Sequence, residues 1–384
     1  MDATETTMQT PQGDFVLQRR PRRRREILRA WDSADEYLLR EVAERLQPDK
    51  GMRVLVVNDN FGALTVALAP WAPQAWSDSF LSQLATRDNL LLNGIDPARV
   101  SLLHSLQQPN GPVDLVLIKV PKTLALFEDQ LTKLRPLLRA DTKVLVAGMV
   151  KALPRSVWVM LEKLLGSSDT ALAWKKAKLI RVTPNLTLTV PDNPYPVHYE
   201  LEGTNWLISN HANVFSRDSL DIGTRFFLQH LPLVPRANDI IDLGCGNGVV
   251  GLQAAGQHPG AIVHFVDESF MAVTSARENF NRVFGAARAA AFCVGDGLED
   301  FSPASTDLVL CNPPFHQQQA VGNQIAQRMF RQSREVLRPG GELWVIGNRH
   351  LGYHAVLREL FGNVELVASN AKFVILRVRR DSRS

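Results

Sequence analysis

Residues 240–255 decide the fold of this chain: IIDLGCGNG at 240–248 is followed by an apolar run from Val249 to Ala255. The run Ile240 to Leu243 predicts a short buried strand, and the second apolar run predicts a helix. Between them, glycines at alternate positions predict a turn with positive φ that leaves room for a ligand against the backbone. The spacing is GxGxG rather than the GxGxxG of dinucleotide-binding folds, which disfavours a dinucleotide-dependent oxidoreductase.

The residues after this turn continue the alternation of strands and helices. Strands are predicted at 261–266, 308–310 and 342–346, helices at 270–284, up to 337 and at 351–361, and a terminal hairpin at 364–368 and 373–378. Such alternation predicts an α/β fold, a parallel sheet covered on both faces. Ligands of such sheets bind at the carboxyl ends of the strands, near the point where strand order reverses.

The first half of the chain reads as a degenerate copy of the second. VLVVNDNFGAL at 54–64 aligns with IIDLGCGNGVV at 240–250, DLVL at 114–117 aligns with DLVL at 307–310, and RPLLRADTKVLVAG at 135–148 aligns with REVLRPGGELWVIG at 334–347. Because the matching segments occur in the same order in both halves, they predict two tandem Rossmann-like domains related by duplication. Two unrelated α/β domains with similar patterning are the alternative.

Prolines between 184 and 196 mark the predicted domain boundary. The predicted organisation is a basic, flexible N-terminal segment at 1–26, a degenerate domain for RNA or substrate binding at 27–190, and a catalytic domain at 191–384. The arginine-rich run from Arg19 to Arg25 is either a solubilising tail or a phosphate contact. The stretch WKKAK at 174–178 is either an RNA contact or a solvated edge strand.

Differences between the two halves indicate where the chemistry lies. In the first half only Gly62 remains of the glycine turn, and Lys119-Val120-Pro121-Lys122 stands where the second half has Asn312-Pro313-Pro314-Phe315. The first copy has therefore lost the small residues that let a backbone approach a ligand. Its lysines are candidates for phosphate contacts.

Acidic residues after the next two strands complete a predicted nucleoside pocket in the second half. Asp267 lies 21 residues after Gly246, at a strand end, where a carboxylate can accept hydrogen bonds from both ribose hydroxyls. Asp296, between Gly295 and Gly297, is a candidate acceptor for an adenine amino group or else an ordinary turn residue. Asp242, Gly244, Gly246, Asn247 and Gly248 are the further candidate cofactor-binding residues of the loop.

The Asn312-Pro313-Pro314-Phe315 motif predicts an acceptor site for an exocyclic amine. Two prolines rigidify the backbone, so that the Asn312 side-chain oxygen and the Pro313 carbonyl can accept the two amine hydrogens. The nitrogen lone pair is then turned toward an electrophile, while Phe315 can stack on a planar substrate. Asn312, Pro313 and Phe315 are therefore the candidate catalytic residues. His316 is a candidate proton relay or a structural contact.

Composition limits the class of protein. Hydrophobic residues make up 45% and charged residues 21% of the 384 residues, which is typical of a globular protein. The formal net charge of +4 slightly favours binding to a polyanion. No run is long and apolar enough for a membrane span, and no apolar segment follows the basic N-terminal run as in a secretion signal. Three cysteines without CxxC spacing disfavour a disulfide framework and a zinc site. These features predict a cytoplasmic protein without a metal.

The second half resembles the class I S-adenosylmethionine-dependent methyltransferases, through its glycine loop and the amino-group signature NPPF at 312–315. The whole chain is similar to the RsmC/RlmG type of ribosomal RNA guanine-N2 methyltransferases, most specifically at NHANVFSR (210–217), LDIG (220–223) and NPPFHQQ (312–318). Within that type, WDSADEYLL (31–39) and IKVPKTLAL (118–126) are most similar to the branch that acts on the large ribosomal subunit.

This resemblance implies S-adenosylmethionine as cofactor and the 2-amino group of a guanine in 23S ribosomal RNA as target. It also implies that Phe215, Asp221 and Gly223 lie at the entry to the cofactor pocket. Alternatives remain among enzymes with the same acceptor motif, which methylate small-subunit rRNA, adenine in DNA or glutamine amides in proteins. A non-catalytic RNA-binding factor is a further alternative.

Overall fold

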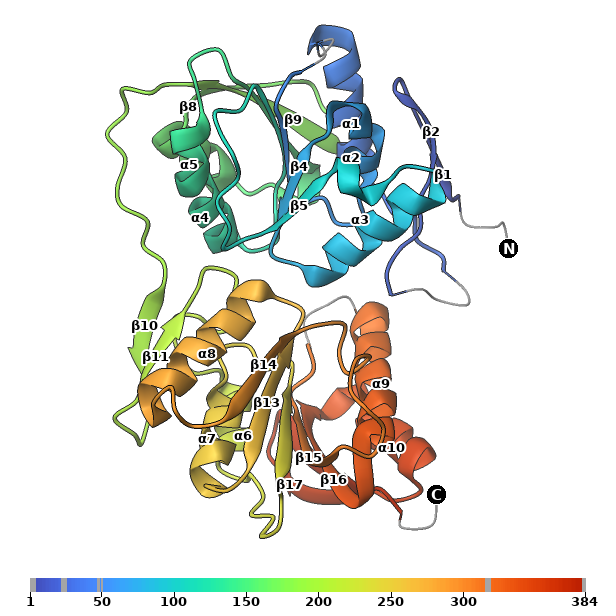
Figure 1. Ribbon diagram of the computed structural model, residues 1–384, viewed down its shortest axis with the longest axis vertical. Coiled ribbons are helices and arrows are strands. Elements are labelled where there is room, and N and C mark those ends of the chain that lie inside the picture. Colours follow the sequence, from blue (N-terminus) through green and yellow to red (C-terminus); the bar gives the residue numbers. More distant parts are fainter. Residues whose placement is uncertain (1–4, 22–25, 47–48, 50, 315–318, 382–384) are drawn as a thin grey trace. The chain divides into compact units, whose positions relative to one another are not determined.

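The structure, a computed structural model, describes residues 5–21, 26–46, 49, 51–314 and 319–381, without the side chains of 319–323. The chain divides between Tyr195 and Pro196 into two compact units, unit 1 (Met1–Tyr195) and unit 2 (Pro196–Ser384) (Figure 1). Each unit is described by itself.

Unit 2 is built on a seven-stranded sheet with the order β14-β13-β12-β15-β16-β18-β17. The strands are β12 (Asp239–Leu243), β13 (Ile262–Asp267), β14 (Ala290–Val294), β15 (Thr306–Cys311), β16 (Leu337–Asn348), β17 (Glu365–Ser369) and β18 (Phe373–Arg379). β14, β13, β12, β15 and β16 pair in parallel, while β18 runs antiparallel to both β16 and β17. The strand order reverses between β12 and β15, so their carboxyl ends flank the expected binding crevice.

Helices cover both faces of this sheet (Figure 1). The helices are α6 (Ile222–Leu228), α7 (Val249–Gln257), α8 (Phe270–Phe284), α9 (Gln319–Val336) and α10 (Tyr353–Phe361). Neighbouring residues of β12 point to opposite faces: Ile240 packs in the core with α6, α7 and α8, and Ile241 packs in the core with α9 and α10. The predicted parallel sheet covered on both faces is confirmed.

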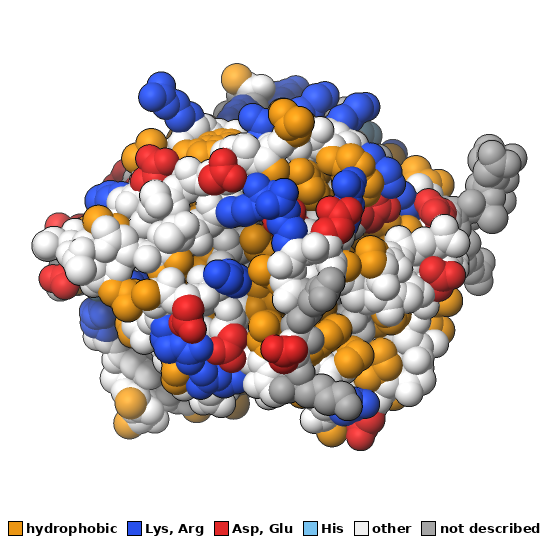
Figure 2. Space-filling model, turned by 90° about the horizontal axis from the view of Figure 1, so that it is seen from above, with side chains coloured by type: hydrophobic (Ala, Val, Ile, Leu, Met, Phe, Trp, Pro, Cys, Tyr) orange, Lys and Arg blue, Asp and Glu red, His pale blue; other side chains and the backbone are white. Residues whose placement is uncertain are grey.

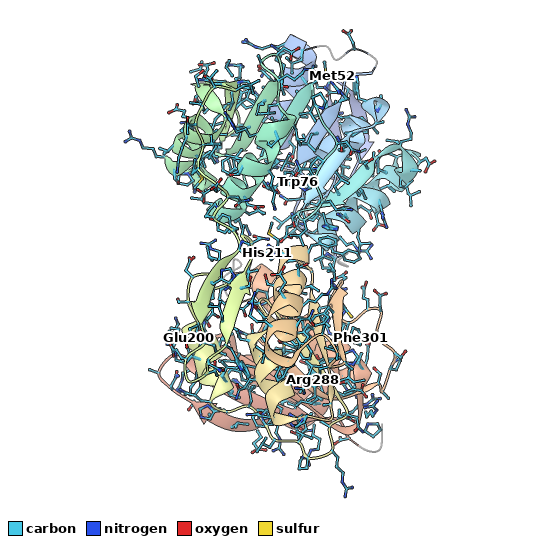
Figure 3. The ribbon with its side chains drawn as sticks, turned by 60° about the vertical axis from the view of Figure 1, so that its left-hand side comes forward. Met52, Trp76, Glu200, His211, Arg288 and Phe301 are labelled. Carbon is cyan, nitrogen blue, oxygen red and sulfur yellow. The ribbon has the colours of Figure 1, made fainter. Side chains whose placement is uncertain are left out.

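A small hairpin that the sequence did not predict precedes this sheet. β10 (Val197–Glu200) pairs antiparallel with β11 (Leu207–Asn210), and Asn279 of α8 accepts from the Ser209 backbone N–H at 2.7 Å. Figure 3 shows His211, directly after β11, beside α8, and Arg288 beyond the far end of that helix. The hairpin therefore packs against α8, and Ile208 of β11 is buried in the same core as α8.

Unit 1 repeats the same sheet, with the order β5-β4-β3-β6-β7-β9-β8. Its strands are β3 (Val54–Val57), β4 (Gln74–Ser77), β5 (Ser101–His104), β6 (Leu115–Lys119), β7 (Lys143–Met149), β8 (Gly166–Thr170) and β9 (Ala177–Pro184), and its helices α1 (Ser33–Glu41), α2 (Ala63–Ala67), α3 (Phe80–Leu92), α4 (Leu124–Leu134) and α5 (Ser156–Leu164). Two sheets with one topology confirm the tandem Rossmann-like fold.

The sequence predicted a flexible segment at 1–26, but the described residues 5–21 contain an ordered hairpin. β1 (Thr7–Thr10) and β2 (Gly13–Val16) form a hairpin, and the fully buried Met8 belongs to the core of unit 1. The Arg19 guanidinium lies 4.5 Å from the centre of the Phe61 ring, and Arg20 donates to Asp88 at 2.6 Å. This segment is basic in composition, but its hairpin also carries Met8 and Phe15, which pack in the core of unit 1. Arg22 to Arg25 lie outside the described residues.

Candidate active site

The glycine turn of unit 2 connects β12 to α7 and is held against β13. Gly244, Gly246 and Gly248 have φ of +75°, +55° and +84°, which glycine adopts without the strain that a side chain brings. The backbone N–H groups of Gly244 and Cys245 both donate to the Val266 carbonyl, at 2.8 and 3.0 Å. The turn is therefore fixed at the carboxyl end of β13.

The three glycines are required for different reasons. A Cβ on Gly248 would lie 2.8 Å from the Ala276 Cβ, so this glycine permits the close packing of α7 on α8. A Cβ on Gly246 would meet no described atom within 4 Å. At Gly244 it would approach only the Met329 side chain, at 3.4 Å, and the Asn312 carbonyl, at 3.6 Å. Open space thus adjoins Gly246, where the predicted cofactor would lie against the backbone.

Two carboxylates support this turn. The Oδ2 atom of Asp267 accepts from the Gly246 N–H at 3.0 Å, and its Oδ1 atom accepts from the Ser269 N–H at 3.0 Å. Asp242 is buried beneath the turn, where its Oδ2 atom accepts from the Gly251 N–H at 2.8 Å. Burial raises the pKa of Asp242 to about 8. Asp267 therefore contacts the turn directly, whereas Asp242 is buried below the turn and contacts α7.

Asn247 has its side chain engaged within unit 2. Its Nδ2 group donates to the Tyr199 hydroxyl at 3.0 Å and to the Asn210 side chain at 2.9 Å, and its Oδ1 atom accepts from the Val249 N–H at 3.3 Å. These contacts tie the turn to the β10–β11 hairpin. The Nδ2 group of Asn247 is thus engaged by the hairpin, which the sequence did not predict.

Asp296 lies at the carboxyl end of β14 and is buried against α9. Arg328 of α9 donates to the Asp296 Oδ1 atom, and Gln332 donates to its carbonyl at 3.2 Å. Arg328 also donates to Glu299. Arg328 was not predicted from the sequence, because its partner Asp296 lies 32 residues away along the chain and no local pattern marks the pair.

Asn312 directly follows β15 and presents a buried acceptor. Its Nδ2 group donates to the Thr224 hydroxyl at 3.0 Å, while its Oδ1 atom is buried without a hydrogen-bond partner among the residues that the structure describes. An unsatisfied buried acceptor costs free energy unless a ligand supplies the donor. The adjacent Pro313 is buried as well. Phe315 and His316 lie outside the described residues.

The residues before α6 form the remaining part of the predicted site. Asp221 is the N-cap of α6, and its Oδ2 atom accepts from the Thr224 N–H at 2.8 Å. A Cβ on Gly223 would lie 3.0 Å from the Phe373 ring, which explains the glycine at this position. The Phe215 side chain is 51% exposed. The hydrogen bond from Asn312 to Thr224 brings the α6 segment and the acceptor motif together.

Unit 1 has polar side chains at the equivalent positions. Asp59 accepts from the Gly62 N–H of the turn at 3.1 Å and from the Thr65 N–H of α2 at 2.8 Å. Lys119 is buried, and its Nζ atom lies 2.7 Å from Asp35 and 2.9 Å from Asp32. Although burial opposes it, attraction to both carboxylates raises the pKa of Lys119. The expectation that Lys119 contacts RNA is wrong, because its buried ammonium group forms ion pairs with Asp32 and Asp35 inside unit 1.

The other end of the sheet in unit 2 carries a hollow of about 610 Å³, lined by Asp307 and Gly341 among others at the amino ends of β15 and β16. It touches none of the predicted site residues. No group of three potential metal ligands occurs among the described residues. Burial raises the pKa of Cys245 and of Cys311, so neither thiol is a ready nucleophile.

Comparison with known proteins gives the class of the two units. A family model described as the methyltransferase small domain matches residues 205–377, and one described as the RLMG N-terminal domain matches residues 5–186. A solved structure, that of the Thermus thermophilus 16S rRNA N2 G1207 methyltransferase RsmC in complex with AdoMet and guanosine, is 21% identical. It has a TM-score of 0.76 and covers 98% of this chain and 97% of that one. Unit 2 is thus a methyltransferase domain, and both units share the RsmC fold.

Curated relatives identify the family. The ribosomal RNA large subunit methyltransferase G of Streptomyces avermitilis is 52% identical over 96% of this chain and 98% of its own length. The protein of that name from Pseudomonas paraeruginosa is 51% identical over the same shares. The chain belongs to the family of ribosomal RNA large subunit methyltransferase G, and the resemblance seen in the sequence is confirmed. Among the described helices, none has the length and apolar character needed to cross a membrane.

Proposed function

We propose that the protein methylates the exocyclic 2-amino group of a guanine in 23S ribosomal RNA, with S-adenosylmethionine as the methyl donor. The observation that carries this proposal is the buried Oδ1 atom of Asn312, which has no partner among the described residues. Asn312 directly follows β15, at the carboxyl edge of the sheet. β15 pairs with β12, the strand that leads into the glycine turn. The relatives named above act on ribosomal RNA of the large subunit, in keeping with this target.

The acceptor motif holds the amine. The Asn312 Oδ1 atom and the Pro313 carbonyl accept its two hydrogens, which directs the nitrogen lone pair away from the ring. Because the nitrogen becomes positively charged as it bonds to carbon, these oxygens stabilise the transition state more than the ground state. The methylated nitrogen then loses a proton to water, so that the site needs no strong base. Phe315 is proposed to stack on the base.

The turn and its carboxylates fit the cofactor. The space beside Gly246 admits a ligand against the backbone, and Asp267 is positioned at that turn to accept from ribose hydroxyls. We assign Asp296 to the adenine amino group, and Phe215 and Asp221 to the pocket entry. Gly244, Gly248, Asn247 and Asp242 shape the turn. When bound, S-adenosylmethionine supplies an electrophilic methyl group, and the protein contributes proximity and alignment.

RNA binding is assigned in part to unit 1. On the face shown in Figure 2, Lys and Arg side chains are interspersed with acidic and hydrophobic ones rather than gathered in one patch. Lys175 lies 2.9 Å from Glu36, and both Lys175 and Lys176 occupy a turn with positive φ before β9. WKKAK is thus a turn that leads into an interior strand, not an edge strand. Lys122, Lys175 and Lys176 are exposed. Because Lys175 already pairs with Glu36, we assign phosphate contacts to Lys122 and Lys176.

A labelling experiment tests the class of substrate. The protein is incubated with radiolabelled S-adenosylmethionine and, separately, with 23S rRNA, 16S rRNA, duplex DNA or a protein extract. We expect label in 23S rRNA and none above background in the other three. Label in DNA or protein would contradict the proposal, as would a protein that binds 23S rRNA without transferring label to it. Label in 16S rRNA alone would assign the enzyme to the other ribosomal subunit.

A further inference from the structure

The hydroxyl group of Thr224 lies between the acceptor residue Asn312 and the N-cap Asp221. Thr224 is the third residue of α6 and is 6% exposed. Its Oγ1 atom is 3.0 Å from the Asn312 Nδ2 atom and 3.3 Å from the Asp221 Oδ2 atom. A hydroxyl has one hydrogen and two lone pairs. Because Asp221 accepts its hydrogen, the Thr224 oxygen is left to accept from Asn312.

From this arrangement we propose that Thr224 is a positioning residue, which together with Asp221 fixes the orientation of the Asn312 carboxamide. The inference rests on the proposed role of Asn312. A carboxamide has two orientations that differ by a half-turn, and only one of them directs oxygen toward the target amine. In the other, the Asn312 NH₂ group would face the amine and two donors would meet. The Thr224 acceptor selects the productive orientation before the substrate arrives.

Unit 1 supplies an independent observation from the same chain. Asp32 is the N-cap of α1, Asp35 is its third residue, and Lys119 ends the strand that aligns with β15. The Lys119 Nζ atom contacts the carboxylates of Asp35 and Asp32 at 2.7 and 2.9 Å. In both units, therefore, the third helical residue accepts from the donor at the strand end. The Lys119 ammonium group has only hydrogen-bond donors, whereas the Asn312 carboxamide also has an oxygen that can accept from a substrate.

Replacement of the hydroxyl tests this role. Thr224→Val keeps the side-chain shape and removes the acceptor, while Thr224→Ser keeps the hydroxyl. Under single-turnover conditions with saturating RNA and S-adenosylmethionine, we expect Thr224→Val to lower the methylation rate at least tenfold. Thr224→Ser should stay within about threefold of wild type, because the hydroxyl is retained. Affinities for S-adenosylmethionine and RNA should be unchanged in both. Thr224→Ala gives the same readout if the valine variant does not fold.

A matched control removes a buried hydroxyl at the start of β15, the strand that leads to Asn312. Thr306 begins β15, is 1% exposed and donates to the Asp239 carbonyl at 2.9 Å. Thr306→Val should therefore lower the melting temperature and leave the rate unchanged. A wild-type rate for Thr224→Val, or an equal loss of rate in Thr306→Val, would overturn the proposal.

A double-mutant cycle separates positioning from a structural effect. If Thr224 acts through Asn312, Thr224→Val should have no further effect on the rate in an Asn312→Ala background. An equal fold-loss in both backgrounds would overturn the positioning role and leave the proposed function standing. A wild-type rate for Asn312→Ala alone would overturn the proposed function as well, so the two failures are distinguishable.

Discussion

Asn312 is the residue on which the proposed chemistry depends most directly. Its Nδ2 group is committed to Thr224, so its Oδ1 atom is directed elsewhere and has no described partner. We expect Asn312→Ala to lower the rate of methyl transfer by ~10²-fold or more, because a positioned acceptor is lost at the charge that develops in the transition state. Calorimetry should show an unchanged affinity for S-adenosylmethionine. A loss of affinity instead of rate would place Asn312 in the cofactor pocket.

Asp242 gives a prediction on pH and stability. Burial raises its pKa to about 8 in the folded protein, against about 3.9 in an unfolded chain. The folded state then holds the proton more tightly, so the contribution of Asp242 to stability falls as pH rises from about 4 to about 8. Asp242→Asn keeps an acceptor for Gly251 and cannot ionise.

The free energy of unfolding of the Asp242→Asn variant, measured by urea titration, should therefore rise relative to wild type between pH 5 and pH 8. The upper limit for this relative change is about 1.4 kcal/mol per pH unit. Above pH 9 the difference should level off. A difference that is independent of pH would mean that Asp242 is ionised throughout.

At the scale of single elements, the turn before α7 separates packing from ligand binding. Gly248→Ala places a Cβ 2.8 Å from the Ala276 Cβ and should destabilise the fold by about 1–3 kcal/mol. Gly246→Ala meets open space, so its cost in stability is only the ~1 kcal/mol of a left-handed conformation. It should instead weaken binding of S-adenosylmethionine at least tenfold. Thermal melts and calorimetry on both variants test this prediction. An unchanged affinity of the Gly246→Ala variant for S-adenosylmethionine would contradict the proposal that the cofactor binds at this turn.

Local sequence was enough to predict most elements of unit 2. The helix α8 has the predicted limits, 270 and 284, because its amphipathic pattern starts after the Ser269 cap and ends at Gly285. The β10–β11 hairpin was missed because four-residue strands carry little periodicity. Thr224 was missed for a related reason: the role that we propose for it depends on a hydrogen bond to a residue 88 positions away along the chain. An alignment of DSAD at 32–35 with DIGT at 221–224 could have revealed it.

At the scale of the whole molecule, the duplication predicts one cofactor per chain. In unit 1, Asn58, Asp59 and Lys119 have their polar groups engaged inside the protein, where unit 2 has open space and an unsatisfied acceptor. Calorimetric titration of the intact protein with S-adenosylmethionine should give one site per chain, and Asp267→Ala should weaken that site. Two sites of similar affinity would show that unit 1 has kept a working pocket.

Identification of the methylated nucleoside tests the central claim most directly. 23S rRNA from cells that lack this methyltransferase is labelled by the protein with radioactive S-adenosylmethionine, digested to nucleosides and separated by chromatography. The account predicts that all label migrates as N2-methylguanosine and that Asn312→Ala, at matched cofactor occupancy, yields none above background in the same time. Label in a methylated adenosine, a cytidine or a ribose 2′-O-methyl group, or full labelling by the Asn312→Ala variant, would contradict it.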